Sequence, residues 1–168
     1  ERVNAMLADL LDRFKFKSQP YASSTDLVDG FKALARDEAE ARLVEDLLEN
    51  ITLYDFTASD ATVAELENGQ FETTFTVTAA KLYADGEGEE TEADFENLVD
   101  IGAFTKRPGY EVLEPADVIS FRLEPLVSGE QVVTVTTDEK PAFVGVDPYS
   151  KFVDRQGDDN ITAVEEAD

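Results

Sequence analysis

The hydrophobic period of the sequence changes near residue 51, and this change limits the fold more than any other feature. Before it, apolar residues recur every three or four positions, as in Met6, Leu10 and Phe14, which predicts amphipathic helices. After it, apolar and polar residues alternate, which predicts half-buried strands. We therefore expect a helical segment over 1–50, the end of a helical region, and an antiparallel β-structure over 51–168.

The helical half divides into three short helices. Pro20 follows the first apolar run and marks its end. Ser23-Ser24-Thr25-Asp26 offers N-cap candidates for a second helix, and Asp37-Glu38 places acids where the helix dipole favours them at the start of a third. Helices this short are not stable alone in water. Their apolar faces are expected to pack on each other or on something downstream.

The β half has turn signals between its alternating runs. Asn68-Gly69 predicts a tight hairpin, and Ser128-Gly129 separates two further strands. The run 85–96 holds seven acids and no base, so we expect a solvated loop there. About seven short strands without intervening helices are typical of an antiparallel, Ig-like β-sandwich. The strand-like runs are 51–57, 61–66, 71–83, 98–104, 110–113, 118–126, 131–137 and 141–146.

The balance of charge excludes several classes of partner. The chain has 168 residues, of which 14 are basic and 38 acidic, so its net charge is −24. Nucleic acid is excluded as a partner and an anionic membrane surface is disfavoured, because both require clustered Lys and Arg. No apolar run approaches the roughly 20 residues of a membrane-spanning helix. The chain begins at Glu1, which we interpret as a piece cut from a longer protein.

The sequence predicts no catalytic, cofactor-binding or metal-binding residue. It contains no Cys and no His, which excludes disulfides, thiol nucleophiles, a Ser-His-Asp triad and a His-Glu-x-x-His zinc site. A Ser–Lys pair at Ser150-Lys151 is unfavourable, because adjacent residues of a strand point to opposite faces. Paired carboxylates could serve a glycosidase, but 38 acids produce such pairs by chance.

The segment 147–160 combines turn residues, aromatic residues and acids. Asp154, Asp158, Asp159 and Asn160 carry the oxygen ligands that calcium prefers. Their spacing is not that of a calcium-binding loop, and Arg155 among them opposes a bound cation. The segment is better interpreted as the final strand and turn of the sandwich, although the sequence leaves open whether it binds a cation. Aromatic residues that could form either core or a docking patch are Tyr83, Tyr110, Phe143, Tyr149 and Phe152.

Several short motifs, taken together, resemble one family over nearly the whole chain. They resemble the C-terminal region of bacterial zinc aminopeptidase-like proteins of the aminopeptidase N type that are fused to or associated with an ABC transporter permease. One departure is Gln156-Gly157, where we expect a pair containing Pro. The motifs are Pro20-Tyr21, Ser24-x-Asp26-Leu27, Leu47-Leu48-Glu49-Asn50-Ile51-Thr52-Leu53-Tyr54-Asp55, Tyr83-Ala84-Asp85-Gly86-x-Gly88-x-Glu90-Thr91-Glu92, Val99-Asp100-Ile101-Gly102-x-Phe104, Ser128-Gly129-Glu130-Gln131, Asp138-Glu139-Lys140-Pro141, Gly145-Val146-Asp147-Pro148-Tyr149 and Asp154-Arg155-x-x-Asp158-Asp159-Asn160.

The resemblance implies a non-catalytic accessory or structural domain. It places the zinc and the catalytic residues in an upstream peptidase domain, and none of them can be carried over to this chain. The implied partners are that peptidase domain and transporter subunits, and the implied parent is anchored in the membrane with this domain outside the cytoplasm, the piece itself being soluble. Two alternatives remain open: an independent module that binds a peptide, a glycan or a partner protein, and a domain stabilised by calcium.

Overall fold

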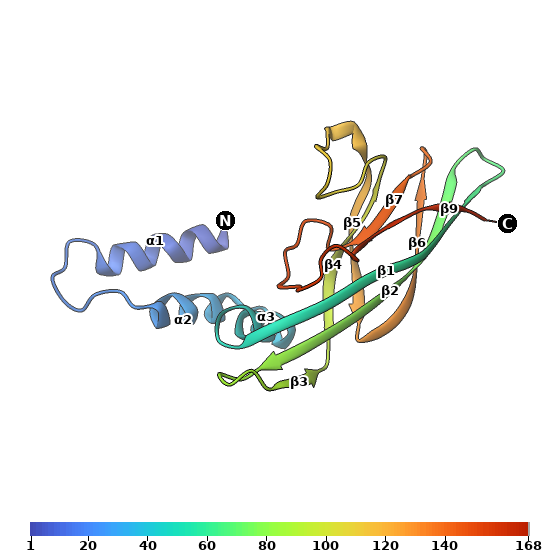
Figure 1. The fold of residues 1–168 in the computed structure, drawn as a ribbon. Helices are drawn as coiled ribbons and strands as arrows, with labels where there is room; N and C mark the ends of the chain where they lie inside the picture. Colours follow the sequence, from blue (N-terminus) through green and yellow to red (C-terminus); the bar gives the residue numbers. More distant parts are fainter. Residues whose placement is uncertain (168) are drawn as a thin grey trace. The chain divides into compact units, whose positions relative to one another are not determined.

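The chain is mostly β-structure preceded by helices, as the sequence predicted. The computed structural model describes residues 1–167. The chain divides into two compact units, Glu1–Ile51 and Thr52–Asp168. The first unit holds the three helices, and the nine strands fall essentially in the second (Figure 1). Within residues 1–167, no helix is both long enough and apolar enough to cross a membrane. The helices are α1 (Arg2–Phe14), α2 (Ser24–Leu34) and α3 (Glu38–Leu48).

Side-chain caps start two of the helices. The hydroxyl of Ser23 accepts a hydrogen bond from the Asp26 backbone N–H at 3.3 Å, and the Asp26 carboxylate accepts one from the Ser23 N–H at 2.9 Å. This reciprocal capping box satisfies N–H groups that would otherwise lack a partner at the start of α2. Asp37 caps α3 with a single side-chain bond, accepting from the Glu40 N–H at 2.9 Å. These are the positions at which the sequence predicted helix starts.

The strands of the second unit form two sheets. The first sheet has the order β3-β2-β1-β9, with β6 also paired to β2, and the second has the order β5-β4-β7-β8. The short strand β9 runs parallel to β1, so the first sheet is mixed. The bounds are β1 (Ile51–Glu65), β2 (Phe71–Ala84), β3 (Glu90–Ala93), β4 (Glu96–Phe104), β5 (Val118–Val127), β6 (Gly129–Thr137), β7 (Phe143–Val146), β8 (Ile161–Ala163) and β9 (Glu165–Glu166).

The two sheets share one hydrophobic core. Buried side chains come from alternate positions of β1, β2, β4, β6 and β7, which is the pattern of two sheets packed face to face. Aromatic rings form one end of this core: Phe56 packs edge-to-face on Phe95 and Phe152, with ring centroids 5.5 Å apart in both pairs. Aromatic pairs of this geometry add about 0.5–1.5 kcal/mol beyond the area that they bury.

The structure corrects the sequence analysis at four places. The runs predicted as two strands, 51–57 and 61–66, form the single strand β1, which continues past Asp60 at a positive φ of 52°. Part of the acidic run forms β3, which pairs with the end of β2 and leaves its acids exposed. Residues 110–113 form no strand, because they lie in a loop without a pairing partner. The segment 147–160 is not the final strand, since β8 and β9 follow it.

Candidate functional site

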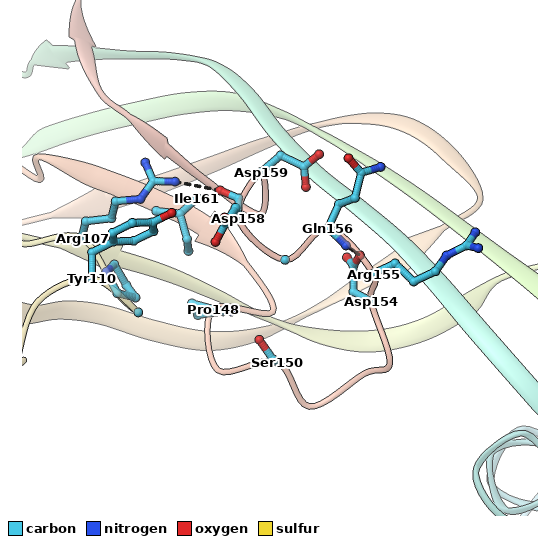
Figure 2. Close-up of a pocket in the computed structure, with 13 residues that line it drawn as sticks. Arg107, Tyr110, Pro148, Ser150, Asp154, Arg155, Gln156, Asp158, Asp159 and Ile161 are labelled. Atoms are coloured by element: carbon cyan, nitrogen blue, oxygen red, sulfur yellow. Dashed lines mark hydrogen bonds between the residues drawn. The ribbon is translucent and has the colours of Figure 1, made fainter.

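An open hollow of about 650 Å³ lies beside the segment that the sequence analysis singled out. Two loops line it, one spanning 107–110 and the other spanning 148–161. Figure 2 shows Arg107 and Tyr110 on one side of the hollow, and Asp154 and Gln156 on the other. The hollow therefore combines two bases, three acids and one exposed aromatic ring.

The first wall is built around Arg107. Its guanidinium carbon lies 5.0 Å from the ring centroid of Tyr110, which is a cation–π geometry. Its Nη2 donates a hydrogen bond to the backbone carbonyl of Asp158 at 2.7 Å (Figure 2). Arg107 therefore joins the two loops, and this hydrogen bond occupies part of its guanidinium. The sequence analysis missed this residue, because an isolated Arg in a turn carries no periodic signal.

Asp117 anchors the loop that carries Arg107. Its carboxylate accepts hydrogen bonds from the Thr105 hydroxyl at 2.7 Å, from the Glu114 backbone N–H at 2.8 Å and from Lys106 Nζ at 2.9 Å. These donors, with Thr105 first, lower the pKa of Asp117 to about 2. The carboxylate is ionised at neutral pH, and its three hydrogen bonds hold the loop in place.

Asp147 fixes the start of the second wall. Its buried carboxylate accepts hydrogen bonds from the backbone N–H groups of Lys151 at 3.0 Å and of Phe152 at 2.9 Å. Burial nevertheless raises its pKa, because the two N–H groups and Lys151 offset only part of the desolvation of the charge. The backbone of Asp147 has a φ of 42°, a conformation that Asp tolerates better than most residues. The acid has a structural task in shaping the turn.

Asp154 joins the segment to the edge of β1. Its Oδ2 accepts from the Phe56 backbone N–H at 3.0 Å, and its Oδ1 accepts from the Gln156 backbone N–H at 2.9 Å. The side-chain amide of Asn160, oriented by its partners, donates from Nδ2 to Asp154 Oδ2 at 3.1 Å and to the Phe56 carbonyl. Because Phe56 is fully buried, this network ties the loop directly to the core.

The surroundings of Asp159 disfavour the charged form of its carboxyl group. Its Oδ1 is buried and has no hydrogen-bond partner among residues 1–167. Burial raises its pKa, and the neighbouring charge of Asp154 raises it further, followed by Asp55 and Asp158. The carboxylate is thus held near other negative charges, and its own backbone N–H offsets only part of the cost. This arrangement costs stability at neutral pH.

The acids of the segment do not converge on a common point. Within the described residues, no group of three or more acidic side chains is arranged to hold a metal ion. The guanidinium of Arg155 donates to both carboxylate oxygens of Glu90, at 2.8 and 3.1 Å, so its charge is already paired. The sequence analysis expected this arginine to oppose a bound cation, and its ion-pair partner lies on β3.

The other residues considered from the sequence are dispersed. Lys151 forms an ion pair with Asp100 and lies 5.6 Å from the ring centroid of Phe121, so it is not paired with the neighbouring Ser150. Phe152 packs against the core aromatics, whereas Tyr110 is exposed at the hollow. These aromatic residues do not form one patch.

The comparisons with known proteins add no family assignment. No family model matches this chain, and a search of curated proteins finds no match. The resemblance drawn from the sequence motifs therefore stays a prediction.

Proposed function

We propose that the chain is a non-catalytic accessory domain of a larger protein, and that its helices pack against a neighbouring helical region of that protein. The parent that the sequence motifs suggest is a zinc aminopeptidase-like protein linked to an ABC transporter permease. In that parent the zinc and the catalytic residues lie upstream of this chain. The domain contributes packing surfaces that support the peptidase.

The exposure of the helices supports this proposal more than any other observation. The only buried residue of α1, α2 and α3 is Asp46, so none of their apolar side chains is buried. Along α1, the exposed fractions of Val3, Leu7 and Leu11 are 43%, 36% and 68%. Helices this short owe most of their stability to the burial of an amphipathic face. The exposed apolar side chains of α1, and the exposed Leu47 and Leu48 of α3, are expected where further protein covers these helices.

The segment 147–160 supports the same proposal from the second unit. Its buried or half-buried carboxylates, Asp147 and Asp154, accept hydrogen bonds from backbone N–H groups of their own loop and of β1. Such bonds position a loop, and they leave these two acids committed to holding the fold. The charges of Asp147 and Asp154 thus serve the scaffold.

Two experiments test the proposal. The isolated chain is assayed against aminoacyl-anilide substrates with and without zinc, and zinc-dependent turnover would contradict the non-catalytic role. Amide hydrogen exchange then compares α1 in this chain and in the longer parent protein. Packing of the helices should slow exchange in α1 about tenfold or more in the parent, because covered helices open less often. Equal exchange rates would refute packing of the helices.

A further inference from the structure

Strand β5 carries its apolar side chains on the outer surface of the sandwich. Its cross-strand register with β4 pairs Leu123 with Asp100 and Pro125 with Leu98. On β4 the inward positions are the buried Val99 and Ile101. The partners of Leu98 and Asp100 therefore face outward, because successive residues of a strand alternate between the two faces.

The outward positions of β5 form an unbroken apolar row. We call this row, together with Leu98 of β4, the outer stripe. Its aliphatic members are well exposed: Leu98 by 55%, Leu123 by 56% and Val127 by 48%. A contiguous apolar patch on a chain that is 31% charged is the kind of surface that marks an interaction site. The members of the outer stripe are Leu98, Phe121, Leu123, Pro125 and Val127.

The polar side chains of β5 lie on the opposite side and have partners there. Arg122 pairs with Glu124, with Nε and Oε2 3.0 Å apart. The Nη2 of Arg122 also donates to the backbone carbonyl of Thr134 on β6 at 2.9 Å. The charged side chains of β5 thus face the neighbouring sheet, and its apolar row faces outward. Leu126 is an apolar exception, since it is buried in the core.

Part of the same outer surface is covered by the protein itself. An added Cβ at Gly102 would lie 2.3 Å from the ring of Phe104, so this ring lies directly over Gly102. Tyr149 then packs against Phe104 and Phe121, with ring centroids 6.5 and 5.2 Å apart. Leu98, at the other end of the surface, stays exposed. The fold covers one end of the surface and leaves the other end open.

Strand addition is not how this surface would bind a partner. Pro125 lies in the C-terminal part of β5, which pairs with β4 and is an edge strand of its sheet. Proline has no N–H to donate, and proline in an edge strand blocks further pairing. A partner of this surface therefore contacts side chains of the outer stripe and does not extend the sheet.

Charge selects the class of partner. Two copies of the chain would each bring a net charge of −24 to an interface, and a charge this large opposes self-association. Asp94 and Glu96 are exposed at the end of the stripe, where Glu96 is paired across the strands with Val127. The nearest base at the other end, Lys151, is already paired with Asp100. The surface is complementary to a partner with an apolar centre and a basic rim.

The geometry points to the outer stripe as a docking surface for another protein whose contact patch is apolar and flanked by Lys or Arg. This inference goes beyond the proposed function, because it concerns the sandwich and holds whichever protein the chain belongs to. It predicts a side-chain interface, with affinity set by the leucines and with association accelerated by charge.

A synthetic amphipathic peptide of Leu and Lys is the probe, and a matched peptide of Leu and Glu is its control. Binding to the full chain is measured by calorimetry at about 50 and about 300 mM NaCl. The double variant Leu98→Thr, Leu123→Thr should lose about tenfold or more in affinity, because central apolar contacts dominate such interfaces. The matched variant Val132→Thr removes an exposed valine from β6 and should bind as the natural chain does.

Each other outcome overturns the inference. Equal binding of the Leu–Lys peptide by the double variant and by the Val132→Thr variant would show that charge alone attracts it. Equal binding of the Leu–Glu and Leu–Lys peptides would show that the surface does not select a basic partner. Self-association of the chain that the double variant abolishes would assign the surface to a second copy. Absence of any binding at about 100 μM peptide would refute a docking surface, whereas the zinc-dependent assay above tests the accessory role separately.

Discussion

Replacing Asp154 with Ala should lower the free energy of unfolding by about 2–3 kcal/mol. The carboxylate accepts from the Phe56 N–H at 3.0 Å and from the Gln156 N–H at 2.9 Å. A buried donor left without its acceptor costs about 1–3 kcal/mol, and Phe56 is fully buried. The Gln156 bond lies in an exposed turn and contributes less. Relief of the repulsion between Asp154 and Asp159 offsets part of the loss.

Urea unfolding followed by far-UV circular dichroism at pH 7, in buffer with a chelator, measures the effect. The matched control is Asp158→Ala, because the exposed Asp158 contributes its backbone carbonyl to Arg107 and this carbonyl survives the substitution. The control should stay within about 0.5 kcal/mol of the natural chain. Asp154→Asn should fall between the two, since an amide keeps one acceptor and removes the charge.

The comparison with the control decides between two interpretations of the segment. If Asp154→Ala and Asp158→Ala change stability equally, the hydrogen bonds of Asp154 do not hold the loop to β1, and the reasoning is refuted. If calcium stabilises the natural chain and both variants remove that effect, the acids serve a cation. A large effect of Asp154 alone, in the presence of chelator, supports the scaffold role.

Four further results are expected. Asp159→Asn should raise the melting temperature at pH 7, because the raised pKa of Asp159 shows that its charge is unfavourable in the fold; the advantage should shrink as the pH falls towards that pKa. Asp117→Asn should be less stable than the natural chain at pH 7, and the difference should close between about pH 4 and about pH 2, because a lowered pKa stabilises the fold only above it. Gly145→Ala should destabilise by about 1–3 kcal/mol in urea, because the new Cβ would lie 2.7 Å from the Asn160 carbonyl oxygen. Millimolar calcium should raise the melting temperature no more than NaCl of equal ionic strength, and a larger rise would indicate a cation site.

Local signals in the sequence predicted most of the elements. The caps at Ser23 and Asp37 start helices where their hydroxyl and carboxylate were expected to do so. The Asn68-Gly69 turn forms, with Gly69 at a φ of 84°. The strand β3 was missed because its acids have low strand propensity, and pairing with β2 supplies the stabilisation. Such pairing is a contact between two strands and cannot be read from the composition of one of them.

The sequence predicted less of the candidate site than of the fold, because the site depends on contacts that form only on folding. The sequence identified Asp154 and Asp159 as residues of interest, and both line the hollow. It could not show that Asp154 accepts hydrogen bonds from two backbone N–H groups while Asp159 has a buried Oδ1 without a partner. Arg107 and Asp117 were missed altogether, because their importance arises from contacts with residues that the chain brings together only on folding.

The alternation in β5 shows what a period of two does and does not determine. The run 118–126 was correctly expected to be a strand, and its alternation places Phe121 and Leu123 on one face. The period is the same whether that face is the core or the surface. The orientation of β5 is decided by contacts on its other face, where Arg122 donates a hydrogen bond to the Thr134 carbonyl of β6. Turning the strand over would break the hydrogen bond from Arg122 to the Thr134 carbonyl and would take the buried Leu126 out of the core. The apolar row therefore faces outward for an internal reason, and covering it is left to a partner.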